Sequence, residues 1–185
     1  MQVTALSIPE VKLITPQRFG DQRGFFMETW NRRTFAGLGL DHDFVQDNHS
    51  LSREFPVLRG LHFQIAPHAQ VKLVRVVRGR ILDVAVDIRK GSPTYGRHVS
   101  AELSADNGQM LLVPVGFAHG FVTRAPDTEV VYKVTDYYAP ACDRGIAYDD
   151  PALGIDWQLG GAKPILSEKD LRHPRLADAG APFRY

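Results

Sequence analysis

Strict alternation of large apolar side chains with small or polar ones is the feature that most constrains the fold of this chain. It is clearest in residues 81–88, where leucine, valine and isoleucine hold the even positions and Asp83, Ala85 and Asp87 lie between them. Successive side chains of a β-strand point to opposite faces, so a period of two indicates a strand rather than a helix. The pattern predicts a strand at 81–88 with one buried face.

Similar short runs, rich in β-branched and aromatic residues, recur along the whole chain. The further strands predicted from them are 11–15, 24–30, 44–49, 57–64, 71–77, 99–103, 110–113, 120–123 and 128–135. Turn-forming residues separate several of these runs, as at 78–80, 90–93 and 105–108. Many short strands divided by turns indicate an all-β sandwich or barrel, and not strands that alternate with helices.

Helical signals are few. Residues 31–38 are predicted to form a short helix that ends at two nearby glycines, and 167–170 to begin another that stops before Pro174. The chain has 185 residues, and we identify no internal repeat or linker in it. This length suits a single domain that spans 1–185.

Charge and cysteine content exclude several functions. The formal net charge is +1, so no global field attracts the chain to nucleic acid or to an anionic membrane, and neither is expected as a partner. Cys142 is the only cysteine, which excludes an internal disulfide and fits a reducing compartment. The first residues lack the pattern of a secretory signal, and no apolar stretch approaches the length of a membrane span. We therefore expect a cytoplasmic protein.

Two stretches combine a histidine with nearby glycines in a way that is typical of an active site. The first is Arg-Gly-Leu-His-Phe-Gln at 59–64, followed by Lys72, and the second is Pro-Val-Gly-Phe-Ala-His-Gly at 114–120. Together they resemble the paired motifs of the cupin superfamily. The resemblance implies a double-stranded β-helix (jelly-roll) barrel that encloses the active site, with a few short helices at its periphery.

The first motif departs from that of metal-binding cupins. Those proteins supply two histidines one residue apart and a carboxylate shortly afterwards, because imidazole and carboxylate together suit a divalent ion. Here Gln64 stands in place of the second histidine, and Lys72 lies where the carboxylate is expected. His62 and His119 alone are too few ligands for a stable site. We predict a barrel without a bound metal.

A histidine beside a lysine suits the removal of a proton next to a carbonyl group. Imidazole titrates near neutral pH and can accept a carbon-bound proton, while a cation stabilises the enolate oxygen that develops. Inversion of that carbon then needs a proton from the opposite face. Tyr132, in the run 128–135, shares a strand face with Val130 and Val134, so it should point inward and is a candidate proton donor.

The chain as a whole resembles the dTDP-4-dehydrorhamnose 3,5-epimerases, from about residue 11 to about residue 170. The stretches that carry the resemblance are 20–28, 44–50, 58–64, 114–121, 149–151 and 166–170. Each stretch is a weak signal alone, and their occurrence in one order is a strong one. Members of this family are cofactor-free homodimers that exchange N-terminal strands, so part of each site is expected from the partner chain.

The resemblance also implies a role for individual residues. His62 matches the catalytic base, Asp170 the carboxylate that orients it, Tyr132 the proton donor and Lys72 the cation that stabilises the enolate. The positions that match contacts to the sugar, diphosphate and thymidine are Arg23, Glu28, Gln46, Asn48, Arg59, His119, Tyr138 and Lys169. Phe19 and Phe26 match aromatic residues packed near the nucleotide.

The sequence departs from the family in two places and leaves three points open. Asp143 stands where a substrate-contacting glutamate is expected, and the run 171–174 differs from the usual continuation. From the residues alone, Asp170 is better explained as a helix cap and Tyr132 as a strand tyrosine satisfied by the backbone, and only the resemblance favours their roles in the site. Strict alternation also places Arg59 and His62 on opposite strand faces, so both reach one ligand only if Gly60 marks a bulge or the ligand wraps the strand end.

The reaction implied is inversion at C3 and C5 of dTDP-4-dehydro-6-deoxy-D-glucose, giving dTDP-4-dehydro-L-rhamnose for dTDP-L-rhamnose biosynthesis. The C4 ketone acidifies both neighbouring protons, so one base can serve both carbons. Three alternatives are weighed against it: an isomerase that inverts a single centre of a related sugar, a cupin that binds a nucleotide sugar without converting it, and a metal-dependent cupin oxygenase or isomerase.

Overall fold

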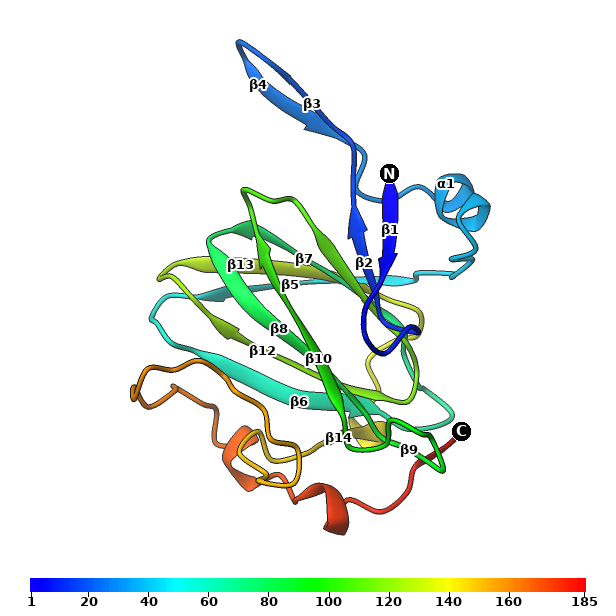
Figure 1. Cartoon of the computed structure of the whole chain (residues 1–185), viewed down its shortest axis with the longest axis vertical. Coiled ribbons are helices and arrows are strands. Elements are labelled where there is room, and N and C mark those ends of the chain that lie inside the picture. The colour runs from blue at the N-terminus through cyan, green and yellow to red at the C-terminus, as the bar shows by residue number, and fades with distance from the viewer.

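Strands dominate the structure, a computed structural model that describes residues 1–185 (Figure 1). Two antiparallel sheets face each other. The first contains, in spatial order, β1 (Gln2–Ala5), β2 (Lys12–Thr15), β11 (Met110–Val113), β7 (Lys72–Arg78), β13 (Thr128–Val134) and β5 (Gln46–Ser52). The second contains β10 (His98–Ser104), β8 (Arg80–Asp87), β12 (Phe117–Thr123), β6 (Leu58–Gln64) and β14 (Asp143–Gly145). This is the cupin-type barrel predicted from the sequence.

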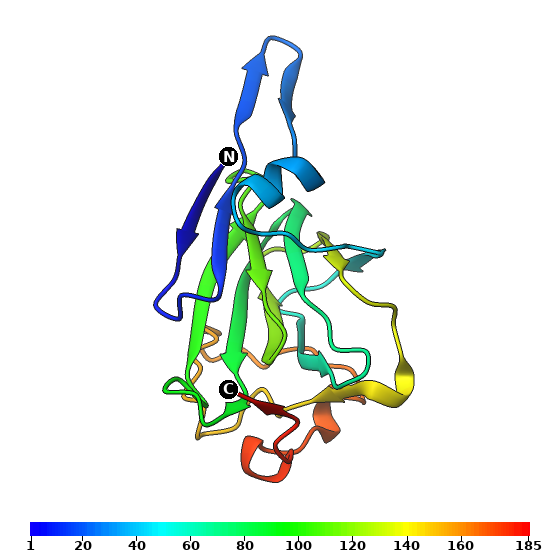
Figure 2. The ribbon, with the colours of Figure 1, turned by 90° about the vertical axis from the view of Figure 1, so that its right-hand side faces the viewer.

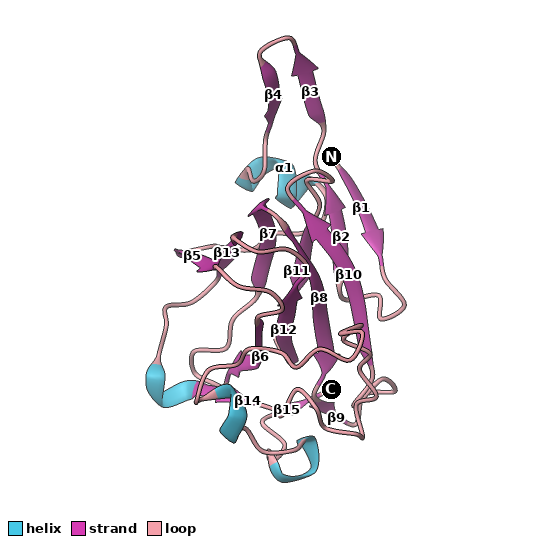
Figure 3. Cartoon of the chain, turned by 90° about the vertical axis from the view of Figure 1, so that its left-hand side faces the viewer, coloured by secondary structure: helices cyan, strands magenta, loops and turns pink.

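The helical segments are short and lie outside the sheets (Figure 3). They are α1 (Arg32–Gly37) and the 3₁₀ turns η1 (Pro140–Cys142), η2 (Asp170–Arg172) and η3 (Leu176–Asp178). Asn31 caps α1 by accepting hydrogen bonds from the backbone N–H groups of Arg33 and Thr34, which confirms the predicted first helix. The second predicted helix is only the single turn η2. None of the helices has the length and apolar character needed to cross a bilayer.

Three apolar clusters hold the layers together. One fills the space between the sheets and includes Val74, Ala85 and Phe121. Another lies between the outer face of the second sheet and the segment after β14, and includes Trp157. The last joins the outer face of the first sheet to α1 through Phe35. The segment after β14 therefore stabilises the second sheet from outside, as Figure 1 shows.

The structure corrects the prediction of one buried face at 81–88. Every residue from 81 to 88 is buried, because the segment after β14 covers the outer apolar face of β8. Asp83 and Ala85 point into the barrel, where the sequence pattern placed solvent. A carboxylate inside a barrel needs a polar partner, and Asp83 has one in His119.

A bulge in β6 resolves the conflict between Arg59 and His62. His119 of β12 pairs with His62 and Phe121 pairs with Arg59, so two residues of β6 lie opposite the single residue Gly120. Gly60 takes a φ of +121° there, and a Cβ on it would lie 2.6 Å from the Cα of Gly120. The bulge lets Arg59 and His62 project into the same cavity.

A two-stranded hairpin projects from the barrel beyond α1 (Figure 2). It consists of β3 (Arg18–Asp21) and β4 (Gly24–Met27), and its aromatic residues Phe19, Phe25 and Phe26 are exposed. At the other end of the molecule the short strands β9 (Arg89–Lys90) and β15 (Phe183–Arg184) pair in parallel. Several of these short edge strands were not predicted, because runs of two to four residues carry no measurable periodicity.

Candidate active site

A cavity of about 480 Å³ opens between the two sheets, a volume that suits a small-molecule ligand. Strands of both sheets and the segment 165–170 line it. Seven of the residues singled out in the sequence line this cavity: Arg59, His62, Lys72, His119, Tyr132, Lys169 and Asp170.

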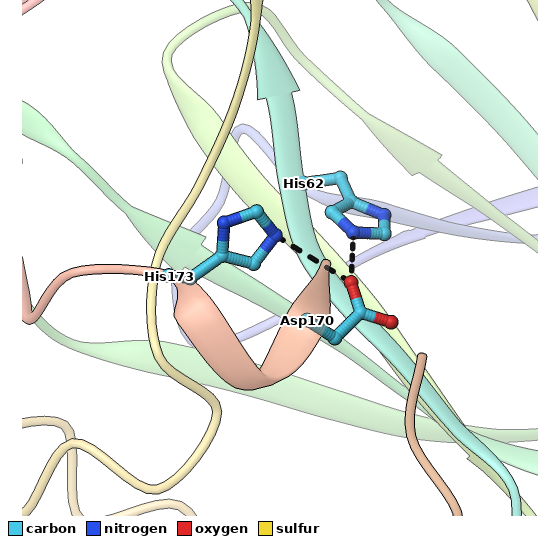
Figure 4. A group of neighbouring side chains, drawn as sticks. All are labelled: His62, Asp170 and His173. Carbon is cyan, nitrogen blue, oxygen red and sulfur yellow. Dashed lines mark hydrogen bonds and ion pairs between the residues drawn. The ribbon is translucent and has the colours of Figure 1, made fainter. Parts of the chain in front are cut away.

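His62 and Asp170 form a hydrogen-bonded pair at the wall of this cavity (Figure 4). The Nε2 atom of His62 lies 2.5 Å from Oδ1 of Asp170, although the two residues are 108 positions apart. Burial alone would raise the pKa of Asp170, but the hydrogen bond from His62 and the positive charge on that ring lower it below its ordinary value. Asp170 is therefore an anion that holds the Nε2–H of His62 and leaves Nδ1 of His62 as the basic atom.

The structure also tests the explanation of Asp170 as a helix cap. Its backbone N–H donates to the hydroxyl of Ser167 at 3.1 Å, which begins the turn η2. Its carboxylate does not return to the backbone of Ser167 but reaches His62. The backbone N–H of Asp170 binds Ser167 while its carboxylate binds His62, so the two interactions occur together. The capped turn thereby positions the carboxylate.

Lys72, at the start of β7, lies beside His62. Its ammonium donates to the backbone carbonyl of His62 at 3.2 Å. Burial lowers the pKa of Lys72 to about 8, and the negative charges of Asp143 and Asp83 partly oppose that effect. Lys72 is thus a partly titrating cation on the cavity wall.

Tyr132 enters the cavity from the sheet opposite His62. It lies on β13, paired with Asn48 of β5 and Val74 of β7. Burial raises the pKa of its phenol, an effect that the positive charge of Arg59 partly offsets. Its hydroxyl has no hydrogen-bond partner within the chain, so the alternative of a tyrosine satisfied by the backbone is wrong.

His119, which lines the same cavity, belongs to a second histidine–carboxylate pair. Nε2 of His119 is 2.6 Å from Oδ1 of Asp83, and both residues are buried. Sequence reasoning singled out His119 and missed Asp83. The sequence signal for Asp83 was a carboxylate within an otherwise apolar strand. Such a carboxylate needs a polar partner if it points into the barrel.

A smaller recess of about 140 Å³ adjoins the cavity and shares His62, Lys72, Tyr132 and Lys169 with it. The recess is also lined by Gln46, Asn48, Tyr138 and Asp143. The carboxylate of Asp143 pairs with the ammonium of Lys169 and accepts a hydrogen bond from the Tyr138 hydroxyl at 3.0 Å. Asp143 thus connects two other predicted contact residues, Lys169 and Tyr138, in the lining of the recess.

Four predicted site residues lie away from both cavities in this chain. Phe19, Arg23 and Phe26 are on the projecting hairpin, where Arg23 pairs with Asp21. The carboxylate of Glu28 accepts hydrogen bonds from the side chains at the start of α1. A single chain does not bring these four residues to His62.

The donor set at His62 favours a shared proton over a shared metal ion. Ligand atoms of His62, Asp170 and His173 lie within 4.8 Å of one another. However, two ligands of one tetrahedral ion are about 3.3 Å apart, whereas His62 and Asp170 are 2.5 Å apart. Gln64, at the second histidine position, is engaged by the backbone of His68, Tyr137 and Ala139.

Comparison with known proteins gives one consistent result. The family model described as dTDP-4-dehydrorhamnose 3,5-epimerase matches residues 5–178. The chain is 52% identical to the dTDP-4-dehydrorhamnose 3,5-epimerase of Sinorhizobium fredii, over 100% of this chain and 94% of that protein.

Two solved structures extend the comparison. A dTDP-6-deoxy-D-glucose-3,5-epimerase from Legionella pneumophila, in complex with dTDP-4-keto-L-rhamnose, superimposes with a TM-score of 0.95 and 44% identity over 100% of this chain and 98% of that one. ChmJ, a 3'-monoepimerase from Streptomyces bikiniensis in complex with dTDP-quinovose, gives a TM-score of 0.88 and 33% identity over 95% of this chain and 88% of that one. The chain belongs to the dTDP-4-dehydrorhamnose 3,5-epimerase family.

Proposed function

We propose that this chain is an isomerase that inverts C3 and C5 of dTDP-4-dehydro-6-deoxy-D-glucose, yielding dTDP-4-dehydro-L-rhamnose for dTDP-L-rhamnose biosynthesis. One observation carries the proposal. A histidine on one sheet, paired with a carboxylate from the turn η2, and a tyrosine on the facing sheet line the same cavity, with a lysine beside the histidine. Inversion needs a base and an acid on opposite faces of the reacting carbon, and this arrangement supplies both.

The first step is removal of a proton next to the C4 ketone. Asp170 holds the Nε2–H of His62, so Nδ1 takes the proton from the sugar carbon. The imidazolium that forms is stabilised by the carboxylate. Electrons of the broken C–H bond move to the ketone oxygen, and the ammonium of Lys72 stabilises the resulting enolate.

The second step is protonation from the other face. Tyr132 donates its phenolic proton to the carbanion carbon, which inverts that centre. The raised pKa of Tyr132 keeps the phenol protonated at neutral pH until the enolate is present. His62 then releases its proton to solvent and Tyr132 regains one from solvent. After the ring turns, the same groups act on the second carbon, because both C3 and C5 adjoin the ketone.

The remaining contact residues are assigned to substrate binding. Arg59 offers a charge-assisted donor to the diphosphate, and His119 lies beside the sugar. Gln46, Asn48 and Tyr138 line the recess next to His62. Lys169 and Asp143 neutralise each other at its mouth, so Asp143 shapes the recess rather than binding the substrate as an anion.

The chain is proposed to act as a homodimer in which the β3–β4 hairpin reaches the site of the other copy. Three exposed aromatic side chains on one projecting hairpin are unusual on a monomer's surface. In a dimer, Phe19 and Phe26 would pack near the partner's bound nucleotide and Arg23 would face its diphosphate, with Glu28 at the base of the hairpin.

Mixing two inactive variants tests this arrangement. Arg23→Ala and His62→Ala chains, unfolded and refolded together in equal amounts, should regain about a quarter of the wild-type activity, because one site in each mixed dimer has both residues intact. Wild-type chains treated in the same way give the reference. If Arg23 served its own chain, no mixed site would be intact and mixing would restore nothing.

The similarity to a 3'-monoepimerase keeps one second candidate, inversion of a single centre. NMR of the product formed in deuterium oxide separates the two. Label at both C3 and C5 is expected, and label at one carbon alone would favour the single-centre reaction.

The assignment of the base is tested by His62→Ala, which should abolish deuterium incorporation at both carbons. His68→Ala is the matched control, since His68 also pairs with an aspartate, Asp136, but does not line the cavity. Full incorporation by His62→Ala would contradict the assignment.

A further inference from the structure

His173 is a buried histidine that the mechanism above does not use. Its side chain is only 9% exposed, and its Nε2 atom has no hydrogen-bond partner within the chain. A buried donor or acceptor without a partner is destabilising, so such a group in a folded protein needs an explanation. The nearest charged atom is Oδ1 of Asp170, 3.5 Å away, which is the same oxygen that binds His62.

Three features hold the ring of His173 in this place. It follows η2 directly, and the carbonyl of the next residue, Pro174, accepts a hydrogen bond from the backbone of Ala147 at 2.8 Å. The ring meets that of His62 edge to face, with centroids 5.4 Å apart. Figure 4 shows both imidazoles directed at the Asp170 carboxylate from two sides.

Gly145 makes room for the ring. It lies on β14 directly opposite His62 of β6, and a Cβ added there would overlap Nε2, Cε1 and Cδ2 of His173. The backbone of Gly145 has no positive φ, so the lack of a side chain is not explained by strain. The space beside the pair is matched to an imidazole.

We propose that His173 is a positioning residue that acts through Asp170: its Nε2–H provides the carboxylate with a second donor and fixes the oxygen that holds His62. Burial and the positive charge on His62 lower the pKa of His173, so it is neutral at neutral pH and can donate one proton without competing as a cation. Hydrogen bonds of this kind often tighten when substrate binds. The inference rests on the proposed role of His62 as base.

His173 does not line either cavity, so its loss should change turnover and not binding. We expect His173→Ala to lower kcat about tenfold with KM for the dTDP-sugar nearly unchanged. His173→Gln should restore most of kcat, because the amide N–H of glutamine reaches to about the position of Nε2. A residue that only fills space would not distinguish Gln from Ala in this way.

A double-mutant cycle with Gly145 tests the same contact, and its Gly145→Ala variant does so without replacing any titrating group. Gly145→Ala should displace the His173 ring and lower kcat about as much as His173→Ala. The double variant Gly145→Ala/His173→Ala should be no slower than either single one, because the added methyl then enters the vacated space. Thermal unfolding of each variant shows whether the fold is retained.

The results separate this proposal from the proposed function. If wild type exchanges solvent deuterium and His62→Ala does not, the base assignment stands. Wild-type kcat in both His173→Ala and Gly145→Ala, or equal losses in His173→Gln and His173→Ala, would then overturn the role of His173 alone. Absence of exchange in the wild type would instead overturn the function.

Discussion

The barrel holds two histidine–aspartate pairs of almost the same geometry, and their surroundings differ. His62–Asp170 and His119–Asp83 have N–O distances of 2.5 and 2.6 Å, and the two histidines are direct neighbours across β6 and β12. The side chain of His62 is 31% exposed and that of His119 is 8% exposed. A base must reach its substrate, so exposure to the cavity, and not the pair itself, makes His62 the catalytic candidate.

The two aspartates also have different origins in the fold. Asp83 is part of a central strand and is fully buried, whereas Asp170 is carried by a single turn in the segment that covers the second sheet. One oxygen of Asp83, Oδ2, has no partner. Asp83 is therefore built into the barrel, and Asp170 is brought to the barrel by a separate segment.

The largest expected difference is in turnover. Asp170→Asn should lower kcat by on the order of 10³-fold, because an amide can donate to Nε2 of His62 and so favour the wrong tautomer. Asp83→Asn should lower kcat less than tenfold, since His119 is assigned to substrate binding and not to proton transfer. Steady-state kinetics of the two variants give the comparison. Equal losses would show that the two pairs share the catalytic work.

The two aspartate variants should also differ in the pH dependence of the rate, because, of these two aspartates, only Asp83 affects the pKa of Lys72. Its cation is the form that stabilises the enolate, and its pKa is lowered to about 8, so the rate should fall as pH rises through about 8. The charge of Asp83 opposes this lowering, so Asp83→Asn should move the basic limb to lower pH, and Asp170→Asn should leave it in place. If the basic limb of the pH profile does not move in Asp83→Asn, the titration of Lys72 is not the cause of that limb.

The smallest expected effect is on the free energy of unfolding. Here the order of the two variants is reversed, and Asp83→Asn should cost more than Asp170→Asn. Asp83→Asn should lower the free energy of unfolding by about 1–3 kcal/mol, because a fully buried hydrogen bond to His119 is disturbed in the barrel interior. Asp170→Asn should cost less, since its turn lies at the periphery. Urea unfolding at neutral pH measures both, and a greater loss in Asp170→Asn would contradict the structural role given to Asp83.

The contrast between Asp83 and Asp170 also shows how much of the fold and of the site can be predicted from the sequence. Alternation at 81–88 identified the strand and grouped Asp83 with Ala85 on one face. It did not show which face is interior, because both faces of β8 are covered, one by a segment more than sixty positions away. A bulge at Gly60 is one of two ways to bring Arg59 and His62 to one ligand, and the structure contains that bulge.

Contacts between distant segments were beyond pattern reasoning. His173 meets Asp170 and His62 because one turn packs against β6 and because Gly145 leaves space, and neither fact has a local signal. The role of Asp170 itself came from the family resemblance, as its local sequence indicates a cap, which the structure also contains. In the proposed homodimer, the position of Arg23 relative to the site depends on a second chain.

The central claim is that base and acid act from facing sheets, and Tyr132→Phe in deuterium oxide tests it most directly. His62 can still remove a proton and return deuterium to the same face, so NMR should show deuterium entering C3 or C5 of the substrate with little epimerised product. Inversion at the wild-type rate in Tyr132→Phe would contradict the claim.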